Sequence, residues 1–232
     1  VWQSQAAGRD ISVQWLNLDV AERDSLYRAL LINYLPENRV YLYNFVFDNC
    51  ATRPYRLIRQ SLPEISFAEE EHPLPTYRQA IQHYTPCGSW ADFGINLVFG
   101  AEADKPMTTE ECLFLPEYLM NHIENAVLPN GERLVSESYI QPFTIRPIPW
   151  YGTWYFGVGV WFIAFCLLSV YDRHRGRRSK WADILMYILY GLLLGIVIFL
   201  TFFSIHPLCG FSPLLLLLPS LHLAARCIYL WK

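Results

Sequence analysis

The sequence has few of the residues that bind metals and cofactors, and none of them in a recognised spacing. It contains six cysteines and six histidines in 232 residues, and no CxxC or HExxH pattern brings them together. A glycine-rich phosphate loop and a GxSxG serine elbow are also absent. These absences argue against a metal enzyme, a nucleotide-binding enzyme and a serine hydrolase. We therefore expect no metal and no cofactor.

Charged residues are missing from two long stretches in the second half of the chain. No Asp, Glu, Lys or Arg occurs in residues 147–171 or in residues 184–225. About 20 apolar residues in a helix suffice to cross the ~30 Å hydrocarbon core of a membrane. The second stretch is long enough for two helices, and turn residues around Pro207 and Gly210 divide it. We predict three transmembrane helices, at about 150–171, 183–205 and 213–231.

The distribution of charge predicts how these helices are oriented. The loop 172–180 carries five Lys or Arg in nine residues, which is typical of the cytoplasmic side of a membrane protein. So short a basic loop between spans does not indicate nucleic-acid binding. Residues 1–150 hold 11 basic and 19 acidic side chains, whereas residues 151–232 hold 7 and 2. We expect an acidic soluble domain on the opposite side from the basic loop.

The chain lacks a first methionine and a signal-peptide pattern, although its first domain has to cross a membrane. We interpret the sequence as a fragment or a processed chain. Three cysteines, Cys50, Cys87 and Cys112, lie in the soluble part. In an oxidising compartment an odd number leaves at least one of them unpaired within the chain. A disulfide between Cys87 and Cys112 is one expectation, and two separate structural thiols are the alternative.

Local patterns predict the elements of the soluble part. Asp19 and Glu22 form a capping box for a helix over 20–34, and the aromatic and β-branched residues 40–47 indicate a strand. A helix from about Cys50 to Ser61 follows, with Pro54 in its first turn. Further predictions are a helix over 76–84, a short helix within 90–104, a helix from Thr108 or Thr109 to about 126, and short strands near 127 and 133–136.

Cys50 is the candidate nucleophile, because it lies where the predicted strand gives way to the predicted helix. The N–H groups and the positive dipole end of a helix start lower the pKa of a thiol. Asn49 is a candidate to orient a partner or to donate to an oxyanion, and Arg53 a candidate to hold an anionic head group. No histidine is placed by its spacing as the general base. A buried structural cysteine remains the alternative.

The run Tyr43-Asn-Phe-Val-Phe-Asp-Asn-Cys-Ala-Thr-Arg-Pro54, preceded by Asn33–Arg39, resembles the periplasmic domain of the Lnb-type lipoprotein N-acyltransferases. Asp48–Pro54 is the most specific part of this similarity, which covers nearly the whole chain. Other similar segments are Trp90 with Phe93–Gly100, Ala103–Lys105, Phe114–Leu119, His206-Pro207 and Pro213–Pro219.

The resemblance implies an α+β fold. It consists of a permuted papain-like domain related to NlpC/P60 enzymes, incomplete at its N-terminus and joined to an α-helical transmembrane region. Residues 1–149 would form the periplasmic catalytic domain, and residues 150–232 a multi-pass region of the inner membrane. In this plan the general-base histidine precedes the cysteine. No histidine precedes Cys50 here, so we expect that residues upstream of Val1 are missing. The family carries about five membrane helices, so we also expect residues after Lys232.

The implied reaction moves an acyl chain from a membrane phospholipid to Cys50, and from Cys50 to the N-terminal amine of a lipoprotein's diacylglyceryl-cysteine. Asp48, Asn49 and Arg53 are assigned supporting roles by the same resemblance. Two alternatives stay open from the residues alone. One is a membrane-anchored cysteine hydrolase or peptidase that acts on cell-wall peptide or lipid, and the other is a non-catalytic membrane scaffold.

Overall fold

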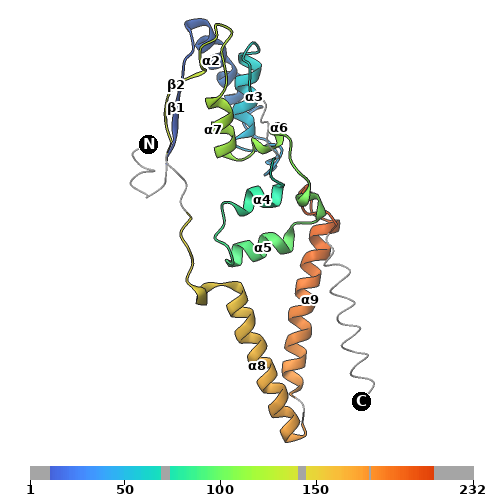
Figure 1. Cartoon of the computed structure of the whole chain (residues 1–232). Coiled ribbons are helices and arrows are strands. Elements are labelled where there is room, and N and C mark those ends of the chain that lie inside the picture. Colours follow the sequence, from blue (N-terminus) through green and yellow to red (C-terminus); the bar gives the residue numbers. More distant parts are fainter. Residues whose placement is uncertain (1–10, 69–73, 141–144, 178, 212–232) are drawn as a thin grey trace. The chain divides into compact units, whose positions relative to one another are not determined.

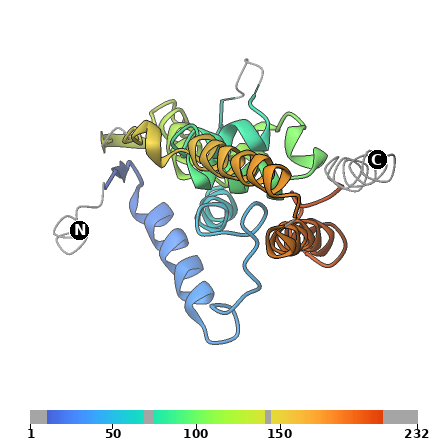
Figure 2. The ribbon, with the colours of Figure 1, turned by 90° about the horizontal axis from the view of Figure 1, so that it is seen from below.

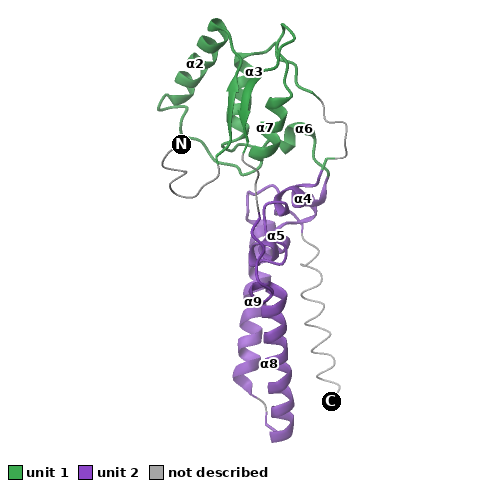
Figure 3. Cartoon of the chain, turned by 60° about the vertical axis from the view of Figure 1, so that its left-hand side comes forward, with its two compact units in different colours: residues 1–74, 106–144 green, residues 75–105, 145–232 purple. Residues whose placement is uncertain are grey.

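A computed structural model describes residues 11–68, 74–140, 145–177 and 179–211. The chain divides into two compact units, which Figure 3 colours separately. Unit 1 comprises Val1–Leu74 with Pro106–Thr144, and unit 2 comprises Pro75–Lys105 with Ile145–Lys232. A segment from the middle of the soluble sequence is thus grouped with the apolar helices. We describe each unit by itself.

Unit 1 is a mixed helical unit with one small sheet (Figure 1). Strand β1 (Val13–Leu16) pairs antiparallel with β2 (Val135–Tyr139), with an irregularity between Trp15 and Leu16. The helices are α2 (Val20–Tyr34), α3 (Thr52–Ser61), α6 (Thr109–Cys112) and α7 (Pro116–Glu124).

The core of unit 1 joins α3, α7 and the residues around β2. Tyr55, Ile58, Leu119, Ile123 and Leu134 are among its buried members. Burial of such side chains contributes roughly 1.5–3 kcal/mol each. Helix α2 differs, because none of its residues is buried. Its capping box is nevertheless formed as predicted, with the Glu22 N–H donating to Asp19 Oδ1 (2.7 Å) and the Asp19 N–H donating to Glu22 Oε2 (2.8 Å).

Two sequence predictions in unit 1 are wrong. Residues 40–47 do not form a strand, because Asn44 and Asp48 exchange backbone hydrogen bonds and close a tight turn. The Asn44 side chain fixes this turn by accepting from the N–H groups of Val46 and Phe47 (3.1 and 3.0 Å). The helix expected from 108 to 126 is broken into α6 and α7, since Pro116 has no N–H to continue the first helix and instead opens the second.

Unit 2 contains two helices long and apolar enough to span a membrane, α8 (Trp154–Arg175) and α9 (Lys180–Phe202). Figure 2 shows them from the end at which they are joined. Gly176 ends α8 in the left-handed conformation (φ 61°), and Asp172 accepts hydrogen bonds from the N–H and hydroxyl of Ser179 (2.7 and 2.8 Å). Two of the three predicted spans are thereby confirmed as helices, and the third, 213–231, lies outside the described residues.

The remaining elements of unit 2 are short. They are α4 (Tyr77–Gln82), α5 (Trp90–Val98) and the 3₁₀ turns η1 (Ala101–Asp104) and η2 (Trp150–Gly152). The Arg78 guanidinium ties α4 to the end of α5, because it donates to both carboxylate oxygens of Asp104 (2.7 and 3.1 Å) and to the carbonyls of Phe99 and Gly100 (3.1 and 3.2 Å).

Candidate functional site

Cys50 lies in the turn that precedes α3, and its thiol is exposed. The helix begins at Thr52, two residues later than the sequence predicts. The thiol is therefore placed just ahead of the first helical turn. An exposed cysteine in this position is accessible to a substrate, which a buried structural thiol is not.

Asn49 holds this turn in place from inside the unit, where it is only 3 % exposed. Its side-chain oxygen accepts from the N–H groups of Ala51 and Thr52 (both 2.9 Å), and its own N–H donates to the Thr52 hydroxyl (2.8 Å). These bonds satisfy N–H groups that a helix start leaves without an intrahelical partner.

The amide nitrogen of Asn49 is engaged as well. It donates to the carbonyls of Phe45 (2.9 Å) and Phe114 (2.8 Å), so both of its hydrogens already have acceptors. The Asn49 side chain therefore positions the main chain around Cys50 and is not available to donate to an oxyanion. The sequence suggested either role, and the hydrogen bonds favour the positioning one.

Asp48 and Arg53 form a paired group beside Cys50. Arg53 donates from Nε and Nη2 to the two oxygens of Asp48 (both 2.9 Å), and Arg56 adds a third bond at 3.0 Å. The hydrogen bond from Arg53 is the main cause that holds the pKa of Asp48 below its ordinary value. Desolvation opposes it, and the charges of Arg53 and Arg56 add to the lowering. Arg53 also lies 3.3 Å from the centre of the Tyr41 ring. Its charge is thus already matched by a carboxylate and an aromatic face.

Cys50 opens onto a groove of about 530 Å³. One side of the groove is α2, which contributes Tyr27, Leu30, Leu31, Asn33 and Tyr34. The other side comes from the chain that surrounds the cysteine, namely Arg39, Tyr41, Cys50, Arg53 and Pro54. The groove is therefore largely apolar along the helix and carries two cations and the thiol opposite it. A hydrocarbon chain with a polar end fits this division of chemistry.

Comparison with known families agrees with both parts of the chain. Residues 2–83 match the model of the Lnb N-terminal periplasmic domain, and residues 154–232 match the model of the Lnb transmembrane domain. The chain belongs to the Lnb family. No curated protein and no solved structure matches it. The family and the two apolar helices together make it a membrane protein.

The Lnb family match covers the whole Cys50 groove, since its lining residues all lie within residues 27–54. The sequence pointed to Cys50 and Arg53 but not to the apolar wall. The signal for that wall is the pair Leu30 and Leu31 on a helix that buries no residue, since exposed apolar side chains on a helix often mark a binding surface.

Tyr43 lies beside Cys50 and was not singled out by the sequence. Desolvation raises the pKa of its phenol above 10.0, and the nearby Cys50 thiol and Tyr41 raise it further. Tyr43 therefore stays protonated at neutral pH, as an ordinary phenol does, and it is not among the residues that line the groove.

The described histidines of this Lnb family member lie elsewhere. His122 is buried on α7, stacked on Phe67 (ring centres 4.7 Å apart) and edge-on to Tyr55. His83 follows α4 and His206 follows α9, and both are exposed. His174 lies in the last turn of α8. Within the described ranges, no histidine lines the Cys50 groove, while His72 and His222 fall outside them.

The expected disulfide is not formed. Cys87 carries a free, exposed thiol, whereas Cys112 is buried in the core of unit 1. The open alternative, two separate thiols, is what the structure shows. Cys112 packs in the core because a cysteine side chain behaves as a small apolar group.

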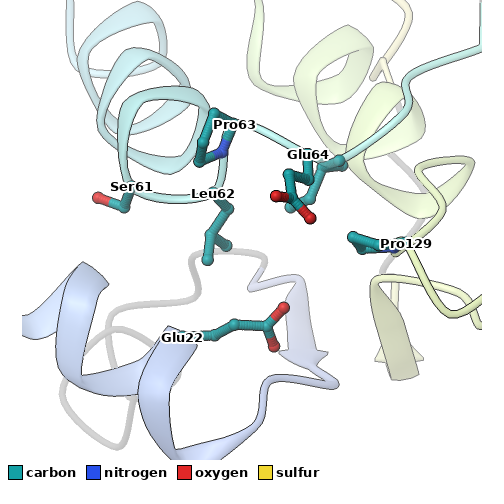
Figure 4. Close-up of a pocket in the computed structure, with 7 residues that line it drawn as sticks. Glu22, Ser61, Leu62, Pro63, Glu64 and Pro129 are labelled. Atoms are coloured by element: carbon teal, nitrogen blue, oxygen red, sulfur yellow. The ribbon is translucent and has the colours of Figure 1, made fainter.

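A second cavity in unit 1, of about 170 Å³, lies between α2, the end of α3 and the turn at Pro129 (Figure 4). Figure 4 shows the carboxylates of Glu22 and Glu64 beside Pro63 and Leu62. Glu22 is committed to the capping box of α2. This cavity contains no thiol and no cation, and we assign it no role in catalysis.

Proposed function

We propose that this protein is a membrane-bound cysteine acyltransferase. Its acyl donor would be a phospholipid, and its acceptor the N-terminal amine of a diacylated lipoprotein. The observation that carries the proposal is the exposed Cys50 thiol at an apolar groove of about 530 Å³ in a chain of the Lnb family. Such a groove suits a hydrocarbon chain, and an exposed thiol beside it suits attack on the ester at the end of that chain.

The proposed reaction has two successive acyl-transfer steps. The Cys50 thiolate attacks the ester carbonyl, the C–O bond breaks, and the lysophospholipid leaves as an alcohol after taking up a proton. The lipoprotein amine then attacks the thioester, the C–S bond breaks, and the thiolate returns as the amine loses a proton. A covalent intermediate divides the transfer into two smaller barriers and produces ping-pong kinetics.

The groove provides a place for each part of the donor. Leu30 and Leu31 supply the apolar wall for the acyl chain, and Arg39 is the better candidate for the lipid phosphate. Arg53 is bound bidentately by Asp48, whereas in the described part of the chain Arg39 makes no ion pair and only approaches the Tyr34 ring, 5.9 Å from its centre. An unmatched guanidinium gains more from a phosphate than one already paired.

The papain-like plan and the cellular location belong to the same proposal. A cysteine just ahead of a helix agrees with that plan, although the described residues of unit 1 form only the small β1–β2 sheet. The basic loop 172–180 supports a cytoplasmic position for the turn between α8 and α9 in the inner membrane, with residues 1–149 in the periplasm.

The test is acylation of a lipoprotein in cells that carry the complete protein with Cys50→Ala or Cys50→Ser, followed by mass spectrometry of the lipoprotein N-terminus. We expect N-acylation to be lost in both variants. Cys87→Ala is the matched control, since Cys87 is also an exposed thiol and lies outside the groove. Undiminished acylation in Cys50→Ala would refute the proposal.

A second experiment distinguishes the transferase from a hydrolase. Purified protein is incubated with labelled phospholipid, with and without a lipopeptide that has a free amine. A transferase yields acylated lipopeptide when the amine is present. Release of free fatty acid at the same rate with and without the amine would assign the protein to hydrolysis instead.

A further inference from the structure

Helix α5 of unit 2 has one polar and one apolar side, and side chains of α4 form hydrogen bonds with its polar side. Gln82 donates to the side-chain oxygens of Asp92 (3.2 Å) and Asn96 (3.0 Å), and Arg78 donates to Asn96 (3.4 Å). Asp92 and Asn96 are four residues apart and so lie on the same side of the helix. The opposite side carries Trp90 and Phe93.

The apolar side of α5 packs against the beginning of α8. The Trp90 ring lies over Gly157, where an added Cβ atom would come within 2.9 Å of the indole. The rings of Phe93 and Trp154 are 5.3 Å apart, and the Trp154 N–H donates to the carbonyl of Gly88 (3.0 Å). The first turn of an apolar span is therefore in direct contact with the start of α5.

The other end of α5 is held by the chain that follows α9. The Gly100 N–H donates to the Leu208 carbonyl (2.9 Å), and the Ala101 N–H donates to the Phe211 carbonyl (3.0 Å). Because α8 and α9 are joined by the short turn at Gly176, the start of α8 and the end of α9 lie on the same side of the membrane. Helix α5 is thus fixed at both ends at the level where the two spans leave the hydrocarbon core.

We propose that α5 is an interfacial helix that lies along the membrane surface and contacts the lipid head-group layer through Trp90. Lipid, and not another protein, covers the exposed side of α5, because the exposed side chains around this helix are of the kind that concentrate in the head-group layer. Trp90 is 56 % exposed, and it shares unit 2 with three further exposed aromatic residues that adjoin the start of α8, namely Trp150, Tyr151 and Tyr155. Indole and phenol rings combine an apolar body with a polar tip and so favour the boundary between hydrocarbon and water.

The interfacial position of α5 is independent of the reaction proposed for Cys50. Helix α5 lies between the two matched domains, 2–83 and 154–232, and contains no residue of the Cys50 groove. An interfacial α5 would associate residues 75–105 with the membrane-spanning helices, although this segment has the charged and polar residues typical of a soluble domain.

The first test uses the whole chain in phospholipid vesicles that contain a photoreactive phosphatidylcholine. When the diazirine is close to the glycerol, we expect crosslinks on residues 90–98 and none on α4, residues 77–82. When it is at the end of the acyl chain, we expect crosslinks in the middle of α8, where Ile163 and Leu167 are exposed. Labelling of α8 without labelling of α5 would overturn the proposal and would indicate that protein covers this helix.

The second test uses tryptophan emission in vesicles whose lipids are brominated near the head group. We expect Trp90→Phe to remove part of the quenched emission. Trp15→Phe is the matched control, because Trp15 is similarly exposed (50 %) but lies on β1 of unit 1. An equal loss in both variants, or no loss in Trp90→Phe, would contradict contact between α5 and the head-group layer.

Discussion

Around Cys50 in unit 1 the chain is held by hydrogen bonds from a few polar side chains, whereas around α5 in unit 2 it is held by aromatic rings and by close backbone contacts. The Asn49 side chain alone makes four hydrogen bonds that fix the Cys50 turn. In unit 2 the corresponding contacts are spread over Trp90, Phe93 and Gly100. A concentrated polar network fixes one atom accurately but is sensitive to single changes, while a distributed apolar contact tolerates them better.

We expect the largest effect from Asn49→Ala, which removes the side-chain hydrogen bonds that hold the Cys50 turn. It removes the acceptor for two N–H groups and both donors to the Phe45 and Phe114 carbonyls, so we expect the free energy of unfolding to fall by about 3 kcal/mol. The measurement is thermal or urea unfolding of the detergent-solubilised chain.

Asn125→Ala is the control for this change, because Asn125 is exposed and its side-chain amide donates to the Asn121 carbonyl (3.0 Å). We expect it to cost less than about 0.5 kcal/mol. Equal losses in the two variants would show that burial of Asn49 adds nothing.

Gly100→Ala breaks the close backbone contact of unit 2. The new Cβ atom would lie 2.5 Å from the carbonyl oxygen of Gly210, which belongs to the main chain and cannot rotate away. We expect a loss of about 1–3 kcal/mol. In Gly94→Ala, where nothing lies within 4 Å of the new atom, we expect a gain of up to about 1 kcal/mol because Ala favours the helix. Opposite signs in the unfolding experiment support the contact, and two stabilised variants would contradict it.

Leu31→Ser tests whether the groove binds the acyl chain of the phospholipid. If the acyl chain lies along α2, loss of this side chain raises the KM for phospholipid by roughly tenfold, equivalent to about 1.4 kcal/mol. Ile32→Ser is the matched control, since Ile32 is as exposed as Leu31 (60 % against 49 %) but does not line the groove. Initial rates in mixed micelles of varied phospholipid content measure both. A similar KM in the two variants would place the acyl chain elsewhere.

Arg39→Gln tests the proposed phosphate contact. An exposed charge pair is worth up to about 1 kcal/mol, so we expect at most a roughly fivefold rise in KM, and a smaller rise at high salt. Arg28→Gln controls for net charge, because Arg28 pairs with Asp24 on α2 and lies outside the groove. If Arg53→Gln raised KM while Arg39→Gln did not, the phosphate would be assigned to Arg53.

The smallest effect concerns pH. The pKa of Asp48 is lowered in the folded chain, so its contribution to stability is complete above the ordinary value of 3.8 and is lost as the pH falls through the lower folded value. We expect the unfolding midpoint to decline below about pH 4, and Asp48→Asn to flatten part of that decline. The midpoint measured from about pH 6 down to about pH 2 tests this. If the unfolding midpoint of Asp48→Asn declined with falling pH as steeply as that of the unchanged chain, Asp48 would not contribute to the loss of stability in acid.

Local signals in the sequence were sufficient for several elements. The capping box at Asp19 and Glu22 and the long uncharged stretches predicted α2, α8 and α9, because each depends on residues close together in the chain. The strand expected at 40–47 failed because the side chain of Asn44 competes for the backbone.

Contacts between distant residues could not be predicted. The bond from Asn49 to the Phe114 carbonyl spans 65 positions, and the pairing of Arg78 with Asp104 spans 26. Nothing in the local pattern of Asp48–Pro54 indicates that Tyr41 and α2 complete a groove with Cys50. The sequence proposed Cys50 as the candidate nucleophile, but only the fold identifies the residues that surround it.

The pairing of β1 with β2 has a consequence for how the protein is made. Val13 pairs with Tyr139 and Leu16 with Val135, so the paired residues are 119 to 126 positions apart in the chain. Pairing over such a separation is slow to form and cannot begin until the later strand has been synthesised. Residues 75–105 emerge before that point, while their partners on α8 and α9 emerge after it. Unit 1 therefore cannot complete its sheet until synthesis has passed residue 139.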